Sequence, residues 1–222
     1  MHKKRFLFAI LFAVCFALSA SATGMNDLEN FVKNVKTGKA AFTQVVTSPG
    51  RAGQAPRVKT STGTFEFSRP ERFRFDYVKP FAQTIVADGR TLWLYDQDLN
   101  QVTARQQSQV LGSTPAALIA SAADLRALQA DFSLADAPDR DGLQWVLATP
   151  KSSNGQLQSV QIGFRPSAGA RASDVPRLEV LEIVDSFGQR SVLTFADLQA
   201  NVVLPGSAFE FKVPAGADVI RQ

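Results

Sequence analysis

Apolar residues recur at helical spacing near the start of the chain, over residues 26–37. The apolar stripe consists of Leu28, Phe31, Val32 and Val35. Side chains at positions i, i+3, i+4 and i+7 share one face of a helix. Asn26 and Glu29 have the spacing of a capping box, and Gly38 stands where a helix commonly ends. The pattern therefore predicts one amphipathic helix.

Most of the remaining chain alternates between apolar and polar residues with a period of two, which is typical of strands. Asp88-Gly89 is a strong hairpin signal between two of these runs. The ten expected strands are 60–67, 72–78, 81–87, 91–95, 101–104, 131–135, 143–149, 157–164, 177–185 and 190–198. So many short strands in succession favour an antiparallel meander that curls into a barrel.

A helical interruption divides this series of strands. Thr114 can cap a helix, and Pro115 suits its first position. Two short alanine-rich helices are expected over Pro115–Ala122 and Asp124–Ala130, and both must lie against the sheet to bury any surface. A loop of small residues is expected at 166–176.

Aromatic residues are concentrated on one face of two neighbouring strands. Phe65 and Phe67 share a face of the first strand, and Phe73, Phe75 and Tyr77 share a face of the second. Five rings are therefore expected on one side of the sheet. A closed small barrel fills its interior with such side chains, whereas a wider or open one holds a ligand. Periodicity alone does not distinguish these alternatives.

The first 22 residues have the features of a secretory signal peptide. A basic start, Lys3 to Arg5, precedes an apolar run, and Ala20 and Ala22 form an A-x-A cleavage pattern. Cleavage would leave residues 23–222 as a single domain. The whole chain carries a net charge of +4, but three basic and no acidic residues lie in segment 1–22, which leaves +1. This charge gives no indication of a nucleic-acid partner.

The expected mature chain contains neither histidine nor cysteine, because the single His2 and the single Cys15 both lie in segment 1–22. This excludes catalytic units built on His or Cys, zinc sites of the same residues, and disulfides. The carboxylates Asp88, Asp96 and Asp98 stand where turns favour aspartate. We therefore expect no enzyme activity, no metal and no cofactor.

Six segments in order resemble one protein family. They are Phe42-Thr43-Gln44, GTFEFSRPERFRF (63–75), VADGRTLWLYD (86–96), Thr114-Pro115 with Leu118-Ile119, TPKSSNGQL (149–157) and FEFKVPAGADV (209–219). Together they are similar to the outer-membrane lipoprotein carrier family, LolA, of Gram-negative bacteria. The resemblance implies an unclosed antiparallel barrel of about ten to eleven strands with a helical lid.

The resemblance also implies a function and a site. It implies a periplasmic carrier that acts as a monomer and takes acylated lipoproteins from an inner-membrane ABC transporter to an outer-membrane receptor lipoprotein. The residues expected to contact the acyl chains are Phe65, Phe67, Phe73, Phe75, Tyr77, Trp93, Leu118 and Ile119. Arg69 is expected to hold the lid closed through hydrogen bonds from its side chain to the backbone of the lid. Leu92 and Leu94 compete with Trp93 for the inward face.

An alternative from another class is a periplasmic regulator with a similar open barrel, which would sense lipid or mislocalised lipoprotein. Such regulators usually carry a second domain, and 200 residues leave no room for one. A receptor lipoprotein is a further alternative, and it would need a cysteine at its mature N-terminus.

Processing gives the first testable prediction. We expect the exported protein to begin at Thr23 and to be recovered from the periplasm, with a mass that matches residues 23–222. Mass spectrometry of the fractionated protein checks this. Recovery of the full-length chain in membranes, with residues 1–22 intact, would contradict it.

Overall fold

The protein is described by a computed structural model that covers residues 23–50, 53–110, 122–152, 155–166 and 175–222. Its helices are α1 (Gly24–Asn34), α2 (Gln107–Val110), α4 (Leu125–Asp131) and the 3₁₀ turn η2 (Gly206–Phe209). The strands are β1 (Thr37–Ser48), β2 (Arg57–Ser68), β3 (Arg72–Lys79), β4 (Gln83–Asp88), β5 (Thr91–Asp96), β6 (Gln101–Gln106), β7 (Phe132–Arg140), β8 (Leu143–Pro150), β9 (Leu157–Arg165), β10 (Arg177–Asp185), β11 (Arg190–Ala200) and β12 (Asp218–Arg221).

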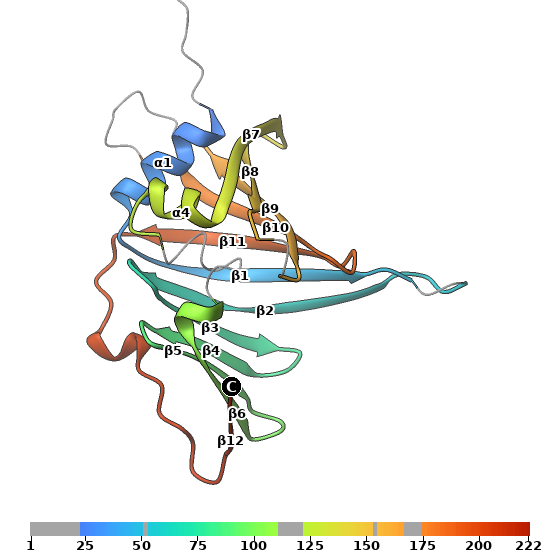
Figure 1. Cartoon of the computed structure of the whole chain (residues 1–222), viewed down its shortest axis with the longest axis vertical. Coiled ribbons are helices and arrows are strands. Elements are labelled where there is room, and N and C mark those ends of the chain that lie inside the picture. The colour runs from blue at the N-terminus through green and yellow to red at the C-terminus, as the bar shows by residue number, and fades with distance from the viewer. Residues whose placement is uncertain (1–22, 51–52, 111–121, 153–154, 167–174) are drawn as a thin grey trace, which may run out of the picture.

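All twelve strands form one sheet, in the order β12-β6-β5-β4-β3-β2-β1-β11-β10-β9-β8-β7 (Figure 1). The edge strands β12 and β7 are not neighbours in this order, so the sheet is unclosed. Consecutive strands pair as hairpins within each half, and the long-range pairing of β1 with β11 joins the halves, with Phe42 opposite Phe195. The expected unclosed, mainly β fold is confirmed.

The strand count differs from the expected ten to eleven. The ten strands expected from the alternation correspond to β2–β11 with shifted ends, and β1 and β12 complete the sheet. β12 pairs with β6 in parallel, whereas the other pairs are antiparallel. A strand of four residues carries too little alternation to be recognised, and its parallel partner lies more than 100 residues earlier.

Helix α1 buries the expected stripe but begins and ends earlier than the sequence suggested. Thr23 caps it, and the Thr23 hydroxyl accepts a hydrogen bond from the backbone N–H of Asn26 at 3.4 Å. Gly38 does not end the helix and lies in β1. A β-carbon at Gly38 would stand 2.3 Å from the ring of Phe67, so glycine is needed there to admit an aromatic side chain.

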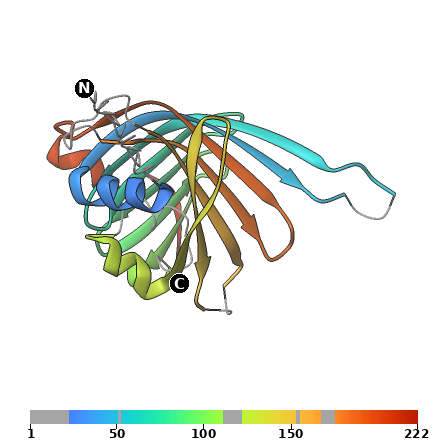
Figure 2. The same cartoon turned by 90° about the horizontal axis from the view of Figure 1, so that it is seen from above.

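The sheet arches over α1 and α4, which lie on its concave side, while the β1–β2 hairpin projects beyond the other strands (Figure 2). Phe31 of α1 packs against Phe164 of β9 at 5.6 Å and against Phe67 of β2 at 6.3 Å, measured between ring centroids. One apolar cluster therefore joins α1 to both halves of the sheet.

The convex face of β3–β6 is covered by the segment that follows β11. Its turn η2 packs against β3 and β4. Farther along the segment, Phe211 stacks on Trp93 with 5.2 Å between ring centroids. Val86 and Val102 are fully buried and lie outside the concave cluster. The C-terminal segment therefore protects a second, smaller apolar surface.

Two expected features fall partly or wholly outside the described residues. Residues 111–121 and 167–174 are not described, so the helix Pro115–Ala122 and the loop 166–176 stay predictions apart from their described end residues. The second expected helix is present as α4, and Asp124 caps it by accepting a hydrogen bond from the N–H of Ala127 at 2.9 Å. No helix in the described part of the chain has both the length and the apolar character needed to cross a membrane.

The shared core gives a prediction on stability. Phe164 is fully buried between α1 and the sheet, whereas Phe187 in the β10–β11 turn is 70% exposed. We expect Phe164→Ala to lower the free energy of unfolding by about 3–5 kcal/mol. The matched change Phe187→Ala should alter it by less than about 0.5 kcal/mol. Chemical denaturation measures both, and equal losses would show that the concave cluster does not hold the halves together.

Candidate functional site

The aromatic residues lie in register across the concave face. In the first inward row, Phe67 of β2 lies opposite Phe73 of β3. Phe73 lies opposite Ala87 of β4, and Ala87 lies opposite Leu92 of β5. The next inward row runs across the same four strands through Phe65, Phe75, Ile85 and Leu94. Side chains of one strand alternate between faces, so these rows form a continuous apolar surface.

The rings on this surface contact one another closely. Phe65 and Phe75 stack at 4.4 Å between centroids, and Phe65 lies 5.5 Å from Phe67. Tyr77 meets the edge of Phe42 at 5.0 Å. Aromatic pairs at such distances contribute beyond the area that they bury. The rings are therefore held as a rigid wall.

A pocket of about 290 Å³ lies against this wall. Its lining side chains are Gln44, Phe73, Phe75, Tyr77, Ile85, Leu92, Leu94, Leu181, Ile183 and Leu193. Phe65 and Phe67 are fully buried behind it. The pocket accepts apolar groups, because nearly all of its lining is hydrocarbon and Gln44 is its one amide.

Trp93 does not join this group, although the sequence suggested it. Leu92 and Leu94 point into the pocket, so Trp93 between them faces the convex side. There its indole N–H donates to the Asp88 carboxylate at 2.8 Å, and its ring stacks on Phe211. Leu118 and Ile119 lie outside the described residues.

Half of the pocket lining was not expected from the sequence: Gln44, Ile85, Leu181, Ile183 and Leu193. Ile85 lies opposite Phe75 and Leu94, so its inward face follows from neighbouring hairpins. Leu181, Ile183 and Leu193 reach the same pocket only through the pairing of β1 with β11, which joins segments about 150 residues apart. Alternation marks the face of each strand, but it carries no information on that pairing.

Arg69 lies buried at the end of β2, below the end of α1. Its Nε–H donates to the Val35 carbonyl at 2.8 Å, and Nη1 donates to the Ala122 carbonyl at 3.3 Å. The guanidinium carbon lies 5.4 Å from the Phe31 ring centroid and 5.2 Å from that of Phe67. Arg69 thus reaches the last residue of the expected lid segment, and it also holds α1, which the sequence did not indicate.

Arg69 stays charged despite its burial, and it orders the segments around it. Burial lowers the pKa of Arg69 to about 10, so the guanidinium remains protonated at neutral pH. A helix end exposes carbonyls that lack partners within the helix, and a cation there is favourable. Nη2 is buried without a hydrogen-bond partner among the described residues. The Arg69 side chain therefore ties α1 and residue 122 to β2.

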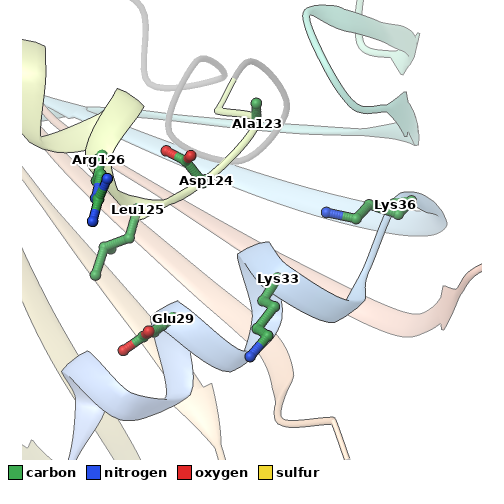
Figure 3. A pocket seen from close by; sticks show the side chains of 7 residues that line it. All are labelled: Glu29, Lys33, Lys36, Ala123, Asp124, Leu125 and Arg126. Atoms are coloured by element: carbon green, nitrogen blue, oxygen red, sulfur yellow. The ribbon is translucent and has the colours of Figure 1, made fainter.

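A second, polar cleft lies between α1 and the start of α4. Figure 3 shows its side chains, which come from α1 and its end and from the start of α4. They are Glu29, Lys33, Lys36, Ala123, Asp124, Leu125 and Arg126. Charges of both signs at an exposed seam are suited to water and not to hydrocarbon.

Two of the three carboxylates considered for catalysis, Asp88 and Asp96, accept hydrogen bonds within turns. Asp88 Oδ1 accepts hydrogen bonds from the N–H groups of Arg90 and Thr91, each at 2.8 Å. Asp96 Oδ1 accepts from the N–H of Leu99 at 3.1 Å. These bonds are the usual role of aspartate in turns.

The match to known proteins covers most of the chain. The family model described as outer membrane lipoprotein carrier protein LolA matches residues 33–212. The chain belongs to the LolA family. The resemblance inferred from six sequence segments is confirmed.

Curated relatives extend the LolA match over almost the full length. The outer-membrane lipoprotein carrier protein of Albidiferax ferrireducens is 69% identical over 97% of this chain and 99% of its own. The protein of the same name from Methylibium petroleiphilum is 50% identical over 96% and 97%. Among solved structures, a DUF1329 family protein from Desulfovibrio piger matches with a TM-score of 0.50 and 12% identity, covering 84% of this chain and 96% of that protein. That last likeness concerns the fold alone.

Proposed function

We propose that the protein is a periplasmic carrier that takes acylated lipoproteins through water with their acyl chains buried in the concave pocket. The observation that carries the proposal is an apolar pocket walled by Phe73, Phe75 and Tyr77 in an unclosed sheet of the LolA family. The names of its relatives support the same cargo.

The cargo explains why a carrier is needed. Each buried methylene group contributes roughly 0.8 kcal/mol, so a protein with several long acyl chains leaves a membrane only if another apolar site receives them. Aromatic walls suit this task, because rings offer large apolar area and have few rotamers to restrict. No step of carriage requires a cofactor or a metal, or the breaking of a bond by the carrier.

The pocket must enlarge during loading. A volume of about 290 Å³ is at the small end for drug-sized ligands, which occupy pockets of roughly 300–1,000 Å³. Several long acyl chains need more space, so loading has to displace α1 or α4. An empty carrier that closes on itself then favours release, since closure recovers the contacts broken on loading.

In this scheme the carrier acts as a monomer between two partners. An inner-membrane ABC transporter supplies the energy for loading, and an outer-membrane receptor lipoprotein receives the cargo because it binds the chains better. Arg69 is the latch: its bonds to Val35 and Ala122 favour the closed state, and loading breaks or strains them.

Lipoprotein uptake tests the proposal. Spheroplasts that hold a labelled lipoprotein are incubated with the purified protein, residues 23–222, and the medium is analysed for a soluble one-to-one complex. Phe73→Glu places a charge in the apolar pocket, where an unpaired carboxylate is very costly, so we expect uptake to fall about tenfold or more.

A matched variant distinguishes the effect of a charge inside the pocket from the effect of an added charge elsewhere on the same strand. Val78 lies on the same strand and is 61% exposed, so Val78→Glu should take up lipoprotein normally. Circular dichroism checks that both variants are folded. If the wild-type protein forms no complex, or if Phe73→Glu forms it as well as Val78→Glu does, the pocket is not the cargo site.

The latch gives a prediction on release. Arg69→Leu removes both hydrogen bonds to the carbonyls of Val35 and Ala122 but leaves the pocket wall intact. We expect the variant to load lipoprotein and to transfer it poorly to the purified receptor, because closing no longer helps to expel the chains. Arg69→Lys keeps the charge but loses the planar fork, so its transfer should be intermediate.

A two-step assay with separate loading and transfer measures these variants. Transfer by Arg69→Leu at the wild-type rate would contradict the latch, and Arg69 would then serve only to anchor α1.

A further inference from the structure

The concave face changes from apolar to polar along the strands. At the helix end, where α1 and Arg69 lie, the inward positions across β2–β5 are Phe67, Phe73, Ala87 and Leu92. The next row toward the far end is also apolar throughout. The far end is formed by the β1–β2, β3–β4, β5–β6 and β10–β11 turns.

The third row carries polar groups on β3, β4 and β5, and it passes through Gly63 on β2 to Phe42 on β1. Tyr77 lies opposite Gln83, and Gln83 lies opposite Asp96. On β2 the inward positions continue past Gly63 to Ser61 and Lys59. On the three neighbouring strands β3, β4 and β5 the change from apolar to polar occurs at the same level.

Two donors of this row are free to bind a ligand. The Tyr77 hydroxyl and the Gln83 amide have no hydrogen-bond partner among the described residues. Burial raises the pKa of Tyr77 to about 12, so its hydroxyl keeps its proton. Neutral donors at the edge of an apolar pocket are suited to carbonyl oxygens, which accept without carrying a charge.

A second pocket, of about 440 Å³, surrounds this polar row. It shares Gln44 and Tyr77 with the apolar pocket, so the two pockets are adjacent. Its outer rim carries exposed apolar side chains: Phe81 is 58% exposed and Leu99 is 69% exposed. The Lys59 amino group lies 4.8 Å from the Phe81 ring centroid.

At the helix end of the trough, Phe67 is fully buried beneath Phe31, and the guanidinium of Arg69 bridges α1 and residue 122. Two polar pockets of the described residues lie at this end, with volumes of about 310 and 260 Å³, and neither shares a lining residue with the apolar pocket. The polar pocket at the far end shares Gln44 and Tyr77 with the apolar pocket, so the far end is the side on which polar groups adjoin the apolar wall.

We propose that the Tyr77–Gln83–Asp96 row is the head site for the cargo, which takes the ester-linked glyceryl group of the lipidated cysteine. The acyl chains then run toward Phe73 and the helix end, and the attached polypeptide leaves the trough at the far end. Tyr77 and Gln83 donate to ester carbonyls. This inference rests on the proposed function and adds the direction of the cargo.

Photo-cross-linking tests the direction. A benzophenone amino acid replaces Gln83 in one variant and Lys36, at the helix end, in another. Each variant is loaded with a diacylated cysteinyl lipopeptide that bears a peptide tag, and cross-links to the tag are measured after irradiation. We expect the Gln83 variant to give at least about tenfold more tag cross-links than the Lys36 variant.

The outcomes separate this inference from the proposed function. Binding with equal cross-linking from the two positions, or with more from the Lys36 position, overturns the direction alone. Failure of the wild-type protein to bind the lipopeptide overturns both the proposed function and the head site.

A second measurement tests the chemistry of the head site. Tyr77→Phe removes only the hydroxyl, and loss of one hydrogen bond corresponds to a decrease in affinity of about threefold to tenfold. That decrease is expected for a lipopeptide with ester-linked chains and not for the ether-linked analogue, which lacks the carbonyls. Equal losses for the two ligands would show that the hydroxyl does not contact an ester.

Discussion

The structure depends on one constraint: a large apolar concave surface must be kept from water without being filled. An ordinary core satisfies its apolar side chains by packing them to crystal-like density. Here β2 and β3 supply rings that stack on each other, yet a pocket of about 290 Å³ remains beside Phe73 and Phe75. An empty apolar cavity is costly, because its lining loses contacts. The sheet is unclosed, so that cost can be relieved either by inward movement of the helices or by a ligand. The helices, the buried arginine and the uneven polarity of the trough are all consequences of this balance.

Burying Arg69 between α1 and β2 costs free energy, and its position shows what the buried charge provides. Burying a guanidinium is unfavourable unless it is hydrogen-bonded, and one of its nitrogens has no partner among the described residues. An apolar residue would pack better in a permanently closed protein. A cation that spans the end of α1 and residue 122 gives instead a contact that is directional and limited in strength. In the proposed function, such a contact is broken by loading and formed again after release, which suits a cycle better than a continuous apolar seam does.

The sequence predicted the fold well and the site in part, for physical reasons that differ between residues. Alternation identified ten strands and the inward face of β2 and β3, because side-chain direction is a local property of a strand. It could not place Leu181, Ile183 or Leu193 beside Phe73, since that depends on the pairing of β1 with β11. Trp93 was assigned inward by family resemblance, but Leu92 and Leu94 occupy those positions and Phe211 covers the indole. Gly38 read as a helix end, whereas its role is to admit the Phe67 ring. Local patterns therefore gave the faces, and most of the missed features depend on partners distant in sequence.

The polarity gradient bears on how a tightly held cargo can leave. With roughly 0.8 kcal/mol for each methylene, simultaneous exposure of whole acyl chains would present a very large barrier. If the head lies at the Tyr77 row, the groups nearest the far end are the first that a receptor can reach, and the exposed rim of Phe81 and Leu99 lies beside them. The chains can then pass from one apolar surface to the next a few methylenes at a time. In the proposed cycle, the helix end closes behind the chains as Arg69 regains its bonds. An unclosed sheet whose apolar pocket adjoins polar residues would in this way divide a large transfer energy into small steps, which a closed barrel with a uniform interior would not do.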